Sequence, residues 1–133
     1  MAWERKMRRS ILGVVMAGLV CVAPAHAQSQ AQMNQTATTE YRAADAAMTQ
    51  AWQAAYARMK ARDAQDTSRG GGFGYAAATL ASQRAWLRFR DAQCVIEGGE
   101  FAGGSLQAMT QAACMTRLTR ERTLQLRRLG ARR

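Results

Sequence analysis

The chain has 133 residues, 48% of them hydrophobic, a formal net charge of +10, three cysteines and one histidine. This length supports one domain with one modest core and excludes a multidomain protein. The histidine, His26, lies in an N-terminal leader, so a His-containing metal site and a Cys-His nucleophile are both excluded from the mature chain.

Residues 1–27 have the pattern of a secretory signal peptide. A basic start precedes an apolar run over 11–23 and a small-residue cleavage site that ends at Ala27. The apolar run has 13 residues, whereas a membrane-spanning helix needs about 20. We therefore expect cleavage after Ala27, no transmembrane anchor in the mature form, and a periplasmic location, with secretion as the alternative.

Two variants of this leader affect the export route. Arg8 and Arg9 resemble a twin-arginine signal, although Met7 stands where a Ser or Thr normally precedes the pair, so both export routes stay open. Lipidation at Cys21 is disfavoured because Val20 is too bulky for a lipoprotein cleavage site. We expect Cys21 to be discarded with the leader.

Cleavage changes both the cysteine count and the charge. Cys94 and Cys114 remain, and an even pair in an oxidising compartment predicts one disulfide. The net charge falls to +7, because four of the 19 basic residues and one of the nine acidic residues lie in the leader. Positive charge gathers near the C-terminus, at Arg117, Arg120, Arg122, Arg127, Arg128, Arg132 and Arg133.

Such a basic tail favours anionic partners, which in the periplasm would be lipid head groups, lipopolysaccharide or acidic proteins. A solvated helix face with a frayed end explains it equally well. No nucleic-acid partner is expected in this compartment.

The mature chain divides into helices separated by glycine-rich breaks. Residues 28–38 are small and polar, which predicts a disordered lead-in before a folded domain over 39–133. Helical spacing of apolar residues predicts a first helix over 39–62. The run around Gly70–Gly74 breaks the pattern, and a second helix is predicted over 75–96. Its proposed packing face consists of Ala78, Ala81, Ala85, Phe89, Ala92 and Ile96.

A third helix is predicted to follow a second glycine-rich loop. Ser105 is placed as its N-cap, and its apolar stripe runs to about Leu129 with Arg122 in the middle. An arginine at that place needs an acidic partner or an open cleft. No sustained alternation of β-branched residues predicts a strand. The fold class is therefore all-α, an antiparallel bundle of three main helices joined by a Cys94–Cys114 disulfide.

A motif in the second predicted helix points to a family. Gln83, Trp86, Arg90, Asp91 and Cys94 form a Q-x-x-W-x-x-x-R-D-x-x-C segment, which resembles the LprI-type lysozyme inhibitor family. The resemblance extends over 45–129, and ordered spacing across three helices is far more specific than one motif.

Two further segments carry the resemblance. Asp45, Met48, Thr49 and Trp52 stand where the family has D-x-x-L-N-x-x-Y, so three of these four positions depart from its usual residues. Downstream, the family's G-G-S, C, L-T, R and L pattern is matched by Gly103, Gly104, Ser105, Cys114, Leu118, Thr119, Arg122 and Leu126.

The signature residues have two interpretations. On a helix, Gln83, Trp86, Arg90 and Cys94 share one stripe. The structural interpretation is that Arg90 or Arg122 pairs with Asp45 or Asp91 as an ionic clasp between helices, and that Trp86 and Phe89 belong to the core. The alternative is a recognition surface that includes Gln83 and Arg90.

No residue is assigned a catalytic role, and no metal or cofactor is expected, because no motif demands acid–base or nucleophilic chemistry. The resemblance implies a protein-binding inhibitor that covers the glycan cleft of a lysozyme-like muramidase. Glu97, Glu100 and Phe101 are the candidate contacts, since an acidic, aromatic loop suits a cationic enzyme. A net charge of +7 opposes binding to a basic lysozyme unless a local acidic patch exists.

The alternative function belongs to another class. It is a periplasmic envelope module whose arginine-rich third helix binds anionic lipid or polymer.

Overall fold

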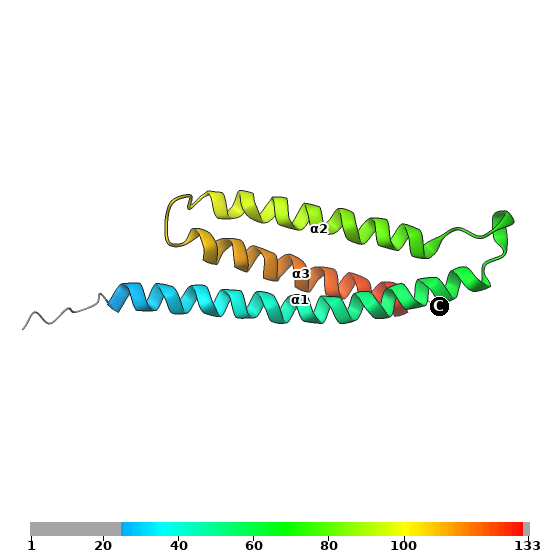
Figure 1. The fold of residues 1–133 in the computed structure, drawn as a ribbon, viewed down its shortest axis with the longest axis horizontal. Helices are drawn as coiled ribbons and strands as arrows, with labels where there is room; N and C mark the ends of the chain where they lie inside the picture. The colour runs from blue at the N-terminus through cyan, green and yellow to red at the C-terminus, as the bar shows by residue number, and fades with distance from the viewer. Residues whose placement is uncertain (1–24, 132–133) are drawn as a thin grey trace, which may run out of the picture.

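The computed structural model describes residues 25–131 as three long antiparallel helices. They are α1 (Ala25–Gln65), α2 (Tyr75–Gly99) and α3 (Gln107–Ala131), with a short 3-10 helix, η1 (Ser68–Gly70), between the first two. All three lie along one long axis and give the molecule an elongated shape (Figure 1). The predicted all-α bundle of three main helices is confirmed. Most of the predicted leader, residues 1–24, and the last two arginines lie outside the described residues.

Helix α1 begins well before the predicted residue 39. The segment 28–38, for which the sequence predicts disorder, is helical. Alanine and glutamine have high helix propensity, and Gln30 Nε2 ties the segment to the Ser105 carbonyl at 3.0 Å. Met33 also lines a groove together with Met109 of α3. Contacts with α3 and with the loop before it therefore stabilise this segment as a helix, and the composition of the segment alone does not reveal them.

The connection between α1 and α2 is built on two aspartates. Asp63 accepts hydrogen bonds from the backbone N–H groups of Tyr75 at 2.6 Å and Ala76 at 2.8 Å, and so caps the start of α2. Asp66 accepts from the N–H groups of Ser68 and Phe73 across the loop. Gly72 sits inside this loop at φ +84°, where a Cβ would lie 2.7 Å from the Asp66 carbonyl oxygen. A side chain at that position would break the turn.

In the connection between α2 and α3, the prediction that Ser105 is the N-cap of the third helix is wrong. Helix α3 begins at Gln107, and the Thr110 N–H bonds to the Leu106 carbonyl at 2.9 Å, so Ser105 lies before the N-cap position. Close to this connection the predicted Cys94–Cys114 disulfide is formed, with Cα atoms 5.5 Å apart. A Cβ on Gly98 would lie 3.1 Å from Gln111 Cβ, so a glycine there lets α2 and α3 approach closely.

The core consists of two clusters that share Trp86. One contains Met48, Ala55 and Leu126, and the other contains the disulfide and Leu118. Helices α1 and α3 share the most extensive interface. Helix α2 contacts this pair through a narrower and more polar face.

The packing face predicted for α2 is the wrong one. All six residues proposed for it are exposed, including Phe89 and Ile96. The buried residues of α2 are Thr79, Gln83, Arg90, Cys94 and Gly98. A single helix cannot turn both stripes toward the core, and the disulfide requires Cys94 to face α3. The apolar stripe therefore faces outward.

Replacing both disulfide cysteines, Cys94→Ser with Cys114→Ser, should lower the free energy of unfolding by about 3 kcal/mol, because the unfolded chain regains the entropy that the crosslink removed. Urea unfolding followed by circular dichroism measures the change. A reducing agent should weaken the wild type to a similar extent and leave the double variant unaffected. Equal stability of wild type and variant would contradict this role.

The pKa of the Asp66 carboxyl lies below its ordinary value of 3.8, because a side-chain hydrogen bond with Ser68 and the N–H groups of Ser68 and Phe73 favour the carboxylate. Asp66 therefore stabilises the loop above pH 3.8 and loses this effect as pH falls through its folded-state pKa. We expect the amide proton shifts of Ser68 and Phe73, followed by NMR, to titrate with a midpoint below 3.8. Asp66→Asn should abolish this titration, and a midpoint above the ordinary value would refute it.

Candidate functional site

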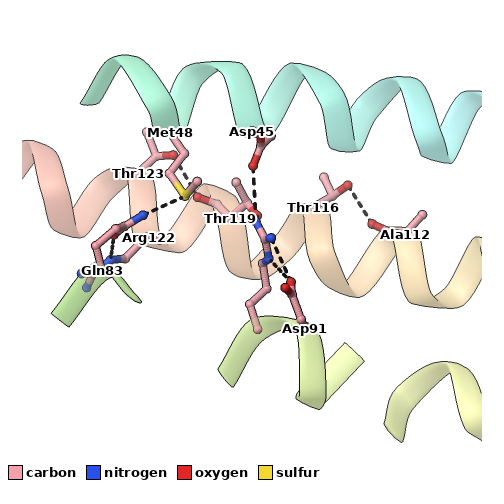
Figure 2. A network of polar contacts seen from close by, with 10 residues as sticks. Asp45, Met48, Gln83, Asp91, Ala112, Thr116, Thr119, Arg122 and Thr123 are labelled. Atoms are coloured by element: carbon pink, nitrogen blue, oxygen red, sulfur yellow. Dashed lines mark hydrogen bonds and ion pairs between the residues drawn. The ribbon is translucent and has the colours of Figure 1, made fainter. Parts of the chain in front are cut away.

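Arg90 lies at the centre of the molecule and contacts all three helices. Its side chain leaves α2 and is buried, with the residue 5% exposed. The guanidinium pairs with Asp45 of α1 at 3.3 Å and with Asp91 at 2.9 Å, and Nη1 donates to the Thr119 hydroxyl of α3 at 3.4 Å. Asp45, Asp91 and Thr119 converge between the helices (Figure 2). We call these four residues the ionic clasp.

Aromatic rings enclose the clasp. The rings of Trp86 and Tyr41 lie 5.3 and 5.5 Å from the Arg90 guanidinium carbon, which favours the cation electrostatically. Burial raises the pKa of the Tyr41 hydroxyl, and the charge of Arg90 acts in the opposite direction. With two carboxylates, one hydroxyl and two rings as partners, the Arg90 charge is compensated inside the fold.

A second polar network surrounds Arg122, one helical turn further along α3. Arg122 Nε donates to Gln83 Oε1 at 2.9 Å, and its terminal nitrogens donate to Gln125 Oε1 at 3.0 Å and to Ser82 Oγ at 3.1 Å. The amide of Gln83 is buried and also contacts Met48 Sδ at 3.7 Å (Figure 2). Burial lowers the pKa of the Arg122 guanidinium. Within residues 25–131 Arg122 forms no ion pair, and it lines an open cavity instead.

The threonines of α3 complete the polar interior. Thr119 is fully buried, and the Thr123 hydroxyl donates to its carbonyl at 2.9 Å. Thr116 donates in the same way to Ala112 (Figure 2). In the part of the chain that the structure describes, every buried side-chain polar atom has a hydrogen-bond partner. Apart from Thr119, the sequence pattern does not predict this row of hydroxyls.

The remaining signature residues support the same interior. Trp52 is half-buried and stacks on Tyr56, with ring centroids 5.0 Å apart, while Leu118 and Leu126 are core residues. Gly104 lies in the α2–α3 loop, where its N–H bonds to the Phe101 carbonyl at 2.9 Å. The structure thus brings most signature residues from three helices to one polar and apolar interior.

The three predicted contact residues lie at the end of α2. Glu97 is held by Arg117 of α3 at 2.9 Å and also accepts a hydrogen bond from Gln93. Glu100 is exposed and follows the last residue of α2, and Phe101 is 41% exposed in the loop.

An apolar strip runs along the outer face of α2 and into this loop, and the sequence prediction assigns its residues Phe89, Ala92 and Ile96 to the packing face. It comprises Phe89, Ala92, Val95, Ile96 and Phe101, and Phe89, Val95 and Ile96 are 54%, 60% and 67% exposed. A signal for it existed, because a helix that turns Arg90 and Cys94 inward must turn the opposite face outward.

Over 25–131, no group of three or more His, Cys, Asp or Glu side chains could hold a metal ion. No helix in that range is long and apolar enough to cross a membrane.

Comparison with known proteins agrees with this arrangement. The sequence profile of the family described as "Lysozyme inhibitor LprI" matches residues 21–126. An uncharacterized protein from Rhizobium meliloti (strain 1021) is 37% identical over 122 residues, which cover 84% of this chain and 88% of the relative. The crystal structure of a DUF1311 family protein from Pseudomonas putida has a TM-score of 0.65 and 22% identity, covering 77% of this chain and 94% of that chain. At that identity the likeness shows the shared fold.

Arg90→Ala should lower the free energy of unfolding by about 2–3 kcal/mol, because it removes the shared partner of Asp45 and Asp91 and leaves a cavity between the helices. Chemical unfolding measures this loss. Arg84→Ala, at an exposed position on the same helix, serves as the control and should change stability by no more than about 0.5 kcal/mol. Equal effects of the two variants would show that the clasp has no structural role.

Proposed function

This chain belongs to the LprI lysozyme inhibitor family, and from that membership we propose that it is an exported protein that binds and inhibits lysozyme-like muramidases through the apolar strip. The strip is the observation that carries the proposal. The inhibitor would act by covering the glycan cleft of the enzyme, which requires binding surface and no catalytic group of its own. We place this activity in the periplasm, where the predicted leader would deliver the chain.

The exposure of the strip supports a binding role. Three large apolar side chains within one helix, each more than half exposed, are unusual on a small soluble domain, and contiguous apolar patches commonly mark interaction surfaces. Phe101 adds an aromatic anchor in the adjoining loop. Burying these side chains against a partner would remove the free-energy penalty of their contact with water.

The local charge around the strip addresses the repulsion expected between two basic proteins. Asp91, Glu97 and Glu100 all lie between residues 89 and 101, where Arg90 is the one cation and is buried in the clasp. Asp91 already pairs with Arg90 and Glu97 with Arg117, and the exposed Arg88 adjoins the strip. Glu100 is therefore the carboxylate best placed to meet a cationic enzyme surface locally, although the net charges repel at long range.

The scaffold beneath the strip is rigid. Cys94 immediately precedes Val95 and is bonded to α3, and the Glu97–Arg117 pair ties the next turn of α2 to the same helix. A surface that is already ordered loses little conformational entropy on binding, which favours affinity.

The envelope-binding alternative has weaker support. Two of the exposed arginines on α3 have acidic partners: Arg117 pairs with Glu97 and Arg120 lies 3.7 Å from Glu40. These pairs reduce the charge that the helix offers to an anionic surface. The alternative stays a prediction.

Purified mature protein should slow the lysis of a cell-wall suspension by a c-type lysozyme in a dose-dependent way. Ile96→Arg should weaken inhibition by about 30-fold, because it removes a central apolar contact and places a cation against a basic enzyme. Leu124→Arg is the matched control, since Leu124 is 51% exposed but lies on α3 outside the strip; it should inhibit like the wild type.

Two different outcomes of this experiment test the proposed inhibition and the proposed contact surface separately. No inhibition by the wild type at a large molar excess would refute the proposed function. Inhibition that survives Ile96→Arg unchanged would refute the assignment of the strip as the contact surface.

A further inference from the structure

A cavity near the start of α2 lies among all three helices, away from the apolar strip. Its volume is about 380 Å³, within the range of small-molecule sites. Apolar side chains from α1 and α3 and the rings of Phe73 and Tyr75 line one part of it, and polar groups line the rest. The lining residues used below are Met59, Leu126, Leu129, Arg62, Tyr75 and Arg122.

Among residues 25–131, Arg122 presents to this cavity a positive charge that has no carboxylate partner. The centroid of the Trp86 ring lies 5.7 Å from its guanidinium carbon, and its three hydrogen bonds go to the neutral oxygens of Gln83, Gln125 and Ser82. These contacts use three of the five guanidinium N–H donors, which leaves one on each terminal nitrogen. Partial burial of a cation without a carboxylate partner is unfavourable. Burial also lowers the pKa of the Arg122 guanidinium, as expected for a cation that is partly removed from water.

A second guanidinium lines the same cavity. Arg62 stacks on the Tyr75 ring at 3.9 Å and donates to the Tyr75 hydroxyl at 3.2 Å, so its hydrogen-bond partner is neutral as well. Asp63 lies on α1 and Asp66 follows its last residue; the charge of Arg62 helps to lower the pKa of Asp66, but both carboxylates accept hydrogen bonds from backbone N–H groups of the connection and of the first turn of α2. The cavity thus combines two cations with an apolar floor.

We propose that this cavity binds a small organic anion, a carboxylate carried on an apolar or aromatic body. The carboxylate accepts hydrogen bonds from the remaining Arg122 donors and lies within the field of Arg62, where charge-assisted hydrogen bonds are strong. The apolar body rests on Met59, Leu126 and Leu129. The proposal is independent of muramidase inhibition, because the strip lies on the outer face of α2.

Titration with 4-phenylbutyrate, followed by NMR shifts of the Ser82 and Gln125 amides and by calorimetry, tests the site. The neutral 4-phenylbutanamide has the same body and should bind at least about tenfold more weakly, since it cannot replace the charge-assisted hydrogen bonds. Equal affinity for the acid and the amide, or no shift at millimolar acid, would overturn the proposal.

Substitutions of the cavity arginines test whether 4-phenylbutyrate binds in this cavity. Arg122→Gln should weaken 4-phenylbutyrate binding about tenfold or more, and Arg62→Gln, at an exposed position where folding is not at risk, should weaken it severalfold. Arg88→Gln, exposed on α2 outside the cavity, is the matched control and should bind like the wild type. Wild-type affinity in both cavity variants, or equal loss in all three, would place the anion elsewhere.

Discussion

The buried guanidinium of Arg90 is the interaction on which the arrangement of the helices depends. Removing a cation from water is costly, and the fold compensates by placing Asp45 from α1, Asp91 from α2 and Thr119 from α3 around it. Because the partners come from all three helices, the clasp fixes their relative position as well as satisfying one charge. An apolar residue of similar size would fill the space without specifying which groups of α1 and α3 it meets.

The clasp and the disulfide together set the rotation of α2. Arg90 and Cys94 lie one helical turn apart, so both can face inward only if the apolar stripe around Phe89 and Ile96 faces outward. The exposed strip is thus a consequence of the way the core is built. A polar interior and an apolar exterior on one helix are unfavourable for an isolated monomer, which is the physical reason to expect a partner on that face.

Particular residues show how far the sequence could predict this structure. Glycines around 70–74 and 98–104 marked the helix ends, and the parity of the mature cysteines indicated the disulfide. Helix α2 has two stripes that repeat at helical spacing, an apolar one around Phe89 and Ile96 and a polar one that contains Arg90 and Cys94. Periodicity cannot decide which stripe faces the core, and composition alone favours the apolar one. The sequence does not predict the helix over 28–38, because this segment is stabilised by contacts with α3 and with the loop before it, such as that of Gln30 with Ser105, and local composition does not contain that information.

The two interior arginines show why a motif alone could not separate structural from binding roles. Both Arg90 and Arg122 are signature residues, and both lie between helices beside Trp86. Arg90 faces two carboxylates, so its charge is compensated within the fold. Among residues 25–131 Arg122 faces neutral amide and hydroxyl oxygens and opens onto a cavity. Both arginines link helices, and the lack of a carboxylate partner is what would leave Arg122 available to an anion.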